Sequence, residues 1–122
     1  MTIDALVPLL SVADVERSIA FYTKVLPFRV AEETAAGGET RWALLRCGPA
    51  ALRIGREDRP GGGDGVRLCL YVDDLRGFRD ALLAAGVAVT EIRLAPYGVE
   101  EFRLRDPDGH ALAVASPAVR IA

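Results

Sequence analysis

Apolar and polar residues follow each other along this chain in an order of short segments that occurs twice. The first half opens with an apolar run over residues 5–12, where Pro8 indicates an edge strand or an irregular start. An apolar stripe with helical spacing follows and ends before Pro27; its members are Val15, Ile19, Tyr22 and Leu26. The pattern then predicts three strands separated by glycine-containing turns, over residues 28–32, 40–47 and 50–54.

The second half repeats this order. Residues 66–72 are predicted as a strand, and a second helical stripe ends at Gly86; its members are Leu75, Phe78, Leu82 and Ala85. Three further strands are predicted, with a type I turn at residues 106–109 before the last one; they cover residues 87–94, 98–105 and 110–116. The chain is therefore predicted to contain a β-α-β-β-β unit twice.

Matching residues of the two halves keep a nearly constant offset. Asp14 precedes the first helical stripe as an N-cap, and Asp73 or Asp74 precedes the second. Asp14 and Asp74 are 74 − 14 = 60 residues apart, while Gly48 and Gly109 are 109 − 48 = 61 apart. One such unit cannot bury both its helix and the other face of its sheet, whereas two together can. We expect a single domain over residues 1–122, made of two modules (about 1–55 and 66–122) joined by a glycine-rich linker over residues 56–65.

Composition excludes several classes of protein. The chain has 122 residues, of which 51 % are hydrophobic, enough for one domain with a buried core. Its 15 Lys and Arg residues against 17 Asp and Glu residues give a net charge of −2, without the basic excess of a nucleic-acid binder. No apolar run reaches the roughly 18 residues that span a bilayer, and no signal-peptide pattern begins the chain. We expect a cytoplasmic protein with no nucleic-acid or membrane partner.

The few residues that commonly carry chemistry set further limits. A single histidine, His110, excludes sites built from several histidines within one chain, and we expect it at the surface or at the rim of a site. Cys47 and Cys69 show no CxxC spacing, so we expect two reduced, mostly buried thiols.

Three patterns in the sequence resemble one known superfamily. They are LxVxDxxRSxxFYxxxL beginning at Leu10, VDDL over residues 72–75, and FxxxDPDGH over residues 102–110. Together they resemble the vicinal oxygen chelate superfamily of glyoxalase I, extradiol dioxygenases, and fosfomycin- and bleomycin-resistance proteins. The resemblance implies an α+β fold in which two βαβββ modules form a curved mixed sheet around a cup. It also implies that the cup closes either within one chain or between two, and we expect a homodimer.

The enzymes of this superfamily hold a divalent metal in the cup with His, Gln or Glu at four strand positions. Carried over by spacing, the first-strand positions fall on Val7 and Arg67, and the positions four residues after the turn glycines fall on Leu52 and Ala113. None of these side chains is a plausible metal ligand, and a guanidinium would repel a cation. We therefore expect no metal, no cofactor and no catalytic residue at these positions; this argues against an enzyme without deciding whether the protein is one.

Residues two apart on a strand share a face, so the four family positions predict which other side chains line the expected cup. If Arg67 faces the cup, Cys69 and Tyr71 face it as well, and if Leu52 faces it, so does Ile54. By the same alternation Trp42, Leu44 and Arg46 face inward, as do Arg103 and Arg105, and Tyr97 lies in a loop at the mouth. The candidate ligand-binding residues are Trp42, Arg67, Cys69, Tyr71, Tyr97 and Arg103.

Each candidate also has a structural interpretation. Trp42 and Tyr71 could equally be core residues, and Arg67 could meet a ligand, a carboxylate or a dimer interface. Arg103 and Arg105 could be solvated or could pair with Glu100 or Glu101.

An aromatic and cationic lining without metal ligands favours binding over catalysis. The hypothesis is a metal-free protein, similar to bleomycin-resistance proteins, that sequesters a small aromatic or anionic molecule, such as an antibiotic. The alternatives are a glyoxalase- or dioxygenase-like lyase or isomerase with a non-standard site, and an interaction module whose cup is filled by its own side chains.

Overall fold

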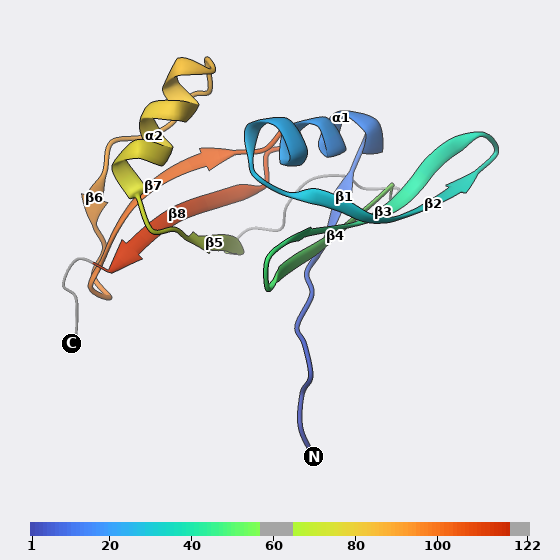
Figure 1. Cartoon of the computed structure of the whole chain (residues 1–122), viewed down its shortest axis with the longest axis horizontal. Coiled ribbons are helices and arrows are strands. Elements are labelled where there is room, and N and C mark those ends of the chain that lie inside the picture. Colours follow the sequence, from blue (N-terminus) through green and yellow to red (C-terminus); the bar gives the residue numbers. More distant parts are fainter. Residues whose placement is uncertain (57–64, 118–122) are drawn as a thin grey trace. The chain divides into compact units, whose positions relative to one another are not determined.

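The computed structural model describes residues 1–56 and 65–117, and residues 57–64 of the expected linker lie outside this description. The described residues form two four-stranded sheets, each with a helix on one face (Figure 1). They divide into two compact units, and residues 107–110 belong to the first. The fold is α+β with two βαβββ modules, which confirms the architecture predicted from the repeat.

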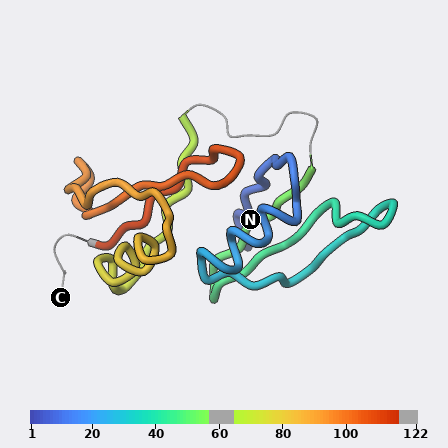
Figure 2. Tube along the Cα trace, turned by 90° about the horizontal axis from the view of Figure 1, so that it is seen from above, coloured from blue at the N-terminus to red at the C-terminus, as the bar shows by residue number. Residues whose placement is uncertain are grey.

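In chain order, the first unit contains β1 (Leu9–Val12), α1 (Val15–Ala20), η1 (Phe21–Val25), β2 (Arg29–Ala36), β3 (Glu39–Cys47) and β4 (Ala50–Arg56). The strands lie in the order β1-β4-β3-β2; β1 runs parallel to β4, and the other neighbours are antiparallel. The helix contacts β3 and β4, which lie beneath it in Figure 2. The first strand begins only after Pro8, as the interruption of the apolar run by proline indicates.

The first helical stripe forms the core of its unit. Asp14 caps α1 by accepting a hydrogen bond from the Arg17 backbone N–H at 3.1 Å. The helix continues into η1, one turn of π-helix, in which the Leu26 N–H donates to the Phe21 carbonyl at 3.2 Å. Tyr22 is fully buried there and packs edge to face on Phe21 and Phe28.

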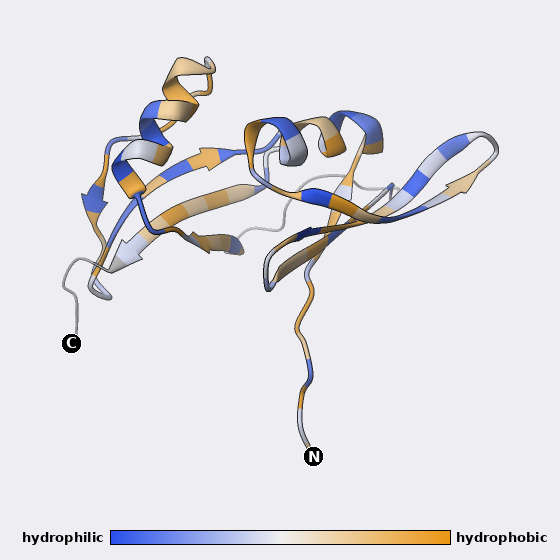
Figure 3. Ribbon diagram, in the orientation of Figure 1, coloured by the Kyte–Doolittle hydropathy of each residue, from blue (hydrophilic) through white to orange (hydrophobic). Residues whose placement is uncertain are grey.

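In chain order, the second unit contains β5 (Arg67–Tyr71), α2 (Leu75–Ala84), β6 (Arg93–Leu94), β7 (Val99–Arg105) and β8 (Ala111–Pro117). The strands lie in the order β5-β8-β7-β6, with β5 parallel to β8. Asp74 caps α2 by accepting from the Gly77 N–H at 3.0 Å, and Gly86 ends the helix with a positive φ of 81°. Polar and apolar residues alternate along α2, whereas β8 is apolar along most of its length (Figure 3).

The strand expected over residues 87–94 is wrong for most of its length, because only Arg93–Leu94 pair as β6. Thr90 takes the place of a strand residue beside β7. Its N–H donates to the Arg103 carbonyl at 3.0 Å, and its hydroxyl oxygen accepts from the Arg103 N–H at 2.8 Å. The Thr90 hydroxyl therefore accepts the hydrogen bond that the backbone carbonyl of a neighbouring strand would otherwise accept, and this segment does not pair with β7 as a regular strand.

The turn between β7 and β8 packs against the start of α1. The Asp108 carboxylate accepts from the Ala13 N–H at 2.9 Å and from the Ser18 hydroxyl at 3.3 Å, and it pairs with Arg17 at 3.4 Å. His110 is only 5 % exposed, and its Nε2 lies 2.8 Å from the Ser11 carbonyl oxygen. The expected surface or rim position of His110 is therefore wrong, because this contact buries the ring within the first unit.

Neither helix in the described part of the chain is long and apolar enough to cross a membrane.

Candidate functional site

The strand register of the second unit sorts its side chains onto two faces. One face is apolar and carries α2, with Phe102, Leu112 and Val114 buried beneath it. The other face carries three cross-strand rows: Tyr71–Ala115–Glu101, Cys69–Ala113–Arg103 and Arg67–Ala111–Arg105. We call this second face the open face of the second sheet. It brings together four of the six candidate residues, namely Arg67, Cys69, Tyr71 and Arg103.

The middle strand of the open face carries only small side chains. Ala113 and Ala115 are 0 % and 1 % exposed, because the long side chains of the flanking strands cover them. The accessible surface of the open face is therefore formed by the long charged and aromatic side chains of the flanking strands. Such a surface suits a flat ligand that contacts these side chains.

A buried carboxylate joins three residues of this face. The side chain of Glu101 is 6 % exposed, and its Oε1 lies 3.2 Å from Arg103 Nη2 and 4.0 Å from Arg67 Nη1. Its Oε2 accepts a hydrogen bond from the Tyr97 hydroxyl at 3.1 Å. Two guanidiniums and a phenol therefore share one acid, which offsets the cost of burying its charge.

Sequence reasoning considered Glu101 only as a possible partner of Arg103 or Arg105. Its central place follows from the register, which sets it beside Ala115 and one pleat from Arg103. Strand alternation could have predicted this position, because Glu101 and Arg103 are two residues apart and therefore lie on the same face of the strand.

Tyr97 reaches this network from a tight turn between β6 and β7. The Gly98 N–H donates to the Ala95 carbonyl at 3.0 Å, and the Ala95 N–H donates to the Val99 carbonyl at 2.7 Å. Desolvation raises the pKa of the Tyr97 hydroxyl above its ordinary value, and the hydrogen bond to Glu101 and the charge of that carboxylate raise it further. The phenol is therefore held in its neutral, hydrogen-bond-donating form.

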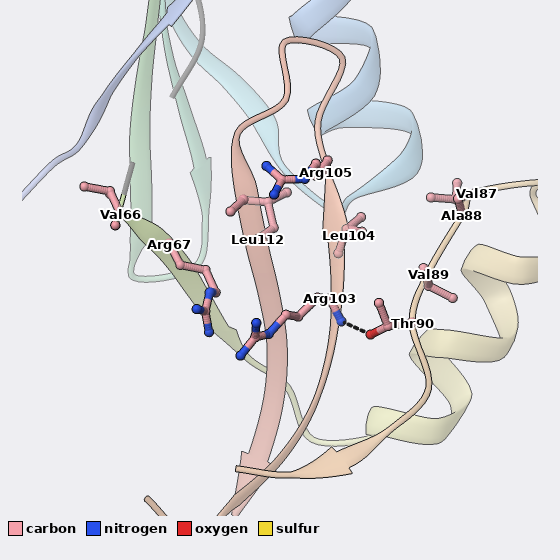
Figure 4. A pocket seen from close by; sticks show the side chains of 12 residues that line it. Val66, Arg67, Val87, Ala88, Val89, Thr90, Arg103, Leu104, Arg105 and Leu112 are labelled. Atoms are coloured by element: carbon pink, nitrogen blue, oxygen red, sulfur yellow. Dashed lines mark hydrogen bonds between the residues drawn. The ribbon is translucent and has the colours of Figure 1, made fainter. Parts of the chain in front are cut away.

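A pocket of about 670 Å³ opens beside β7 and β8 (Figure 4). Its charged lining consists of Arg67, Arg103 and Arg105, and its apolar lining includes Val87, Val89, Leu104 and Leu112. Arg67 and Arg103 extend from β5 and β7 toward each other across β8, and the bond to Thr90 anchors the backbone of Arg103 (Figure 4). The volume lies within the range of about 300–1,000 Å³ that is typical of pockets for small organic ligands.

Two candidate aromatic residues are largely exposed. Trp42 is 42 % exposed on the first sheet, where it pairs with Gly55, and a Cβ at Gly55 would meet the indole at 2.6 Å. Tyr71 is 64 % exposed on the open face of the second sheet. Cys69 is exposed and Cys47 half-buried, so the expectation of two mostly buried thiols is wrong for Cys69, whose side chain points to the open face.

One of the four expected metal positions needs correction. Leu52 and Ile54 lie on the helix-covered face of the first sheet and are 3 % and 0 % exposed. Arg53 lies on the opposite face, because it pairs with Leu9 just as Ala113 pairs with Cys69, and both pairs keep an offset of 60 (69 − 9 and 113 − 53). The spacing from the turn glycine fails because Arg53 follows Gly48 by five residues (53 − 48), whereas Ala113 follows Gly109 by four (113 − 109).

The corrected positions still do not fit a divalent cation. They hold Val7, Arg53, Arg67 and Ala113, two apolar side chains and two guanidiniums, none of which donates an oxygen or a neutral nitrogen. Among residues 1–56 and 65–117, no three His, Cys, Asp or Glu side chains come together as a candidate metal site. The chemistry that the open face offers is hydrogen bonding and charge pairing from arginine, together with aromatic contact.

Comparison with known proteins identifies one family. The family model described as Glyoxalase/Bleomycin resistance protein/Dioxygenase superfamily matches residues 2–114 of the chain. No curated protein matches it.

Solved structures share the fold at low sequence identity. TnmS3, an antibiotic binding protein from Streptomyces sp. CB03234, is 23% identical, with a TM-score of 0.77 over 96% of this chain and 98% of that chain. A bleomycin-binding protein complexed with bleomycin is 24% identical, with a TM-score of 0.74 over 93% of this chain and 98% of that chain. Lactoylglutathione lyase from Agrobacterium tumefaciens is 19% identical, with a TM-score of 0.72 over 95% of this chain and 96% of that chain. Binding proteins and an enzyme are thus similar to the same degree, and these likenesses show the fold alone.

Proposed function

The chain belongs to the glyoxalase/bleomycin resistance protein/dioxygenase superfamily, and on this basis we propose that it binds a small aromatic or anionic organic molecule and sequesters it without chemical change. The observation that carries the proposal is the open face of the second sheet. Where an enzyme of this superfamily would need metal ligands, the chain has Arg67 and Ala113, next to exposed Tyr71 and Tyr97. Arginine and tyrosine recognise ligands by hydrogen bonding and stacking.

The similar structures support the class of ligand. Two of them are described by their ability to bind antibiotics, one in complex with bleomycin. We propose an antibiotic or a similar aromatic compound as the ligand of this chain, and Trp42, Arg67, Cys69, Tyr71, Tyr97 and Arg103 as the binding residues. We further propose a cytoplasmic homodimer that works without a metal, in which each chain is one domain made of two modules.

Sequestration is tested by titrating a panel of aromatic antibiotics against the fluorescence of Trp42, the only tryptophan. We expect a saturable change for at least one compound, and recovery of that compound unchanged, by mass spectrometry, after the protein is denatured. Replacing Tyr71 by Ala should weaken binding because it removes an exposed ring from the open face. Leu83→Ala is the matched control, since Leu83 is 45 % exposed on α2.

Four results would count against parts of the proposal. A broad panel without any binding would contradict ligand recognition. A compound recovered in altered form would indicate an enzyme of the same superfamily. Stoichiometric Zn, Mn, Ni or Fe in the purified protein would contradict the metal-free site. Light scattering measures the mass in solution, and a monomer of 13.1 kDa would contradict the homodimer.

A further inference from the structure

Among the described residues that line the pocket beside β7 and β8, charge has only one sign. These residues include Arg67, Arg103 and Arg105 and no carboxylate. The remaining described lining is Gly65, Thr90 and aliphatic side chains from Val66, from the segment before β6, and from β7 and β8. By strand alternation the three arginines lie on the open face, whereas Leu104 and Leu112 lie on the face that carries α2. The guanidiniums of the open face are complementary to a molecule with an anionic group.

Glu101 holds two of these guanidiniums close together without using all their donors. One oxygen of Glu101 faces both Arg103 and Arg67, at 3.2 Å and 4.0 Å. A guanidinium has five N–H donors, so each arginine keeps donors for a second acceptor. The side chains of Arg67 and Arg103 are 35 % and 51 % exposed, so an incoming ligand can reach them.

The charge of this group is also unbalanced. Two guanidiniums face one carboxylate, 2 − 1 = +1, and Tyr97 adds a neutral donor to the same acid. Bringing a second anion to the outer side of the pair would satisfy the remaining charge, whereas a cation would be repelled. Arginine binds carboxylate and similar oxyanions with paired hydrogen bonds, which fixes their orientation.

We infer that Arg67 and Arg103 form a subsite for the carboxylate, sulfonate or similar oxyanion of an otherwise apolar ligand, and that Glu101 positions the two guanidiniums. This inference rests on the proposed function and narrows it, since it selects anionic ligands over neutral and cationic ones. The apolar body of the ligand lies against the exposed ring of Tyr71, which shares the open face with both arginines. Because its carboxylate occupies donors that a ligand would use, Glu101 also competes with the bound anion.

A pair of fluorescent probes that differ in one anionic group tests this subsite. Anilinonaphthalene sulfonate and N-phenylnaphthylamine have the same ring system, but only the first carries a sulfonate. We expect the wild-type protein to bind the sulfonate probe at least about tenfold more tightly, the factor that one charge-assisted hydrogen bond supplies at a partly exposed site. Arg67→Gln and Arg103→Gln should each reduce that preference severalfold while leaving the affinity for the neutral probe nearly unchanged.

Two further variants separate the subsite from general charge and packing effects. Arg76→Gln removes the same charge from α2, where Arg76 pairs with Glu100, and should leave the preference unchanged. Glu101→Gln keeps the shape of the side chain but removes the competing charge, so the preference for the sulfonate should rise. Circular dichroism checks that each variant is folded.

The outcomes separate the two proposals. If both probes bind equally well, or if Arg76→Gln lowers the preference as much as Arg67→Gln does, the anion subsite is wrong but small-molecule binding remains. If neither probe binds, the subsite is wrong and the proposed function loses its support as well. A fall in the preference for Glu101→Gln would overturn the competition and would show that Glu101 acts by positioning the two guanidiniums.

Discussion

Replacing Asp108 by Ala should destabilise the protein by about 3 kcal/mol. The carboxylate is 4 % exposed and accepts from the Ala13 N–H, the Ser18 hydroxyl and the Arg17 guanidinium. Ser18 is fully buried, so its hydroxyl would be left without this acceptor at a cost of about 1–2 kcal/mol. The exposed N–H of Ala13 can turn to water and costs about 1 kcal/mol. The pair with the half-exposed Arg17 is screened and contributes about 0.5 kcal/mol.

Asp108→Asn separates hydrogen bonding from charge. The amide oxygen can still accept from the Ala13 N–H, and the amide group can still contact the Ser18 hydroxyl, so only the charge is lost. We therefore expect Asn to cost about 1 kcal/mol, a third of the cost of Ala. The control is Asp80→Ala on the exposed side of α2, which should stay within about 0.5 kcal/mol of wild type.

The measurement is urea denaturation at neutral pH, followed by circular dichroism. The free energies are comparable only if the dependence on urea concentration is the same in all variants. A cost below about 1 kcal/mol for Ala would show that water replaces the carboxylate, and equal costs for Asn and Ala would show that the charge, not the hydrogen bonds, stabilises this turn.

Two further predictions concern aromatic side chains. Because desolvation and Glu101 raise the pKa of Tyr97, the phenolate absorbance that Tyr97 contributes should have its midpoint above the ordinary value of 10.0, and Glu101→Gln should lower that midpoint. The folded protein favours the neutral phenol. Its contribution to stability is therefore complete below pH 10 and is lost as the pH rises through the raised pKa of Tyr97. An unshifted midpoint would contradict the contact between Tyr97 and Glu101. Gly55→Ala should displace the indole of Trp42, because the added Cβ would lie 2.6 Å from it, and should shift the emission maximum of the protein. The control is Gly48→Ala, whose added Cβ has no atom near it. Its positive φ costs about 1 kcal/mol of stability, but the emission should stay unchanged. Equal shifts in both variants would refute the contact between Gly55 and Trp42.

Local rules sufficed for most elements of this fold, the strand expected over residues 87–94 being the exception. Two N-cap aspartates, two apolar stripes of helical spacing and alternating strands predicted the βαβββ repeat, because each signal depends on neighbouring residues alone. Alternation along β5 and β7 also placed Arg67, Cys69, Tyr71 and Arg103 on one face, as the register has them. Their role in binding stays a prediction.

Only the tertiary structure decided how separate segments meet. The face on which each residue of β4 lies depends on its spacing from Gly48, so Arg53 rather than Leu52 lies on the face of the first sheet opposite α1. Residues 87–92 have strand-like alternation but bond to β7 through the side chain of Thr90, which no local pattern reveals. Glu101 becomes the centre of the site because strand pairing and one turn bring Arg67, Arg103 and Tyr97 to it from different segments. Periodicity determines the face of a side chain, while the partners of a charge are determined by which strands lie side by side.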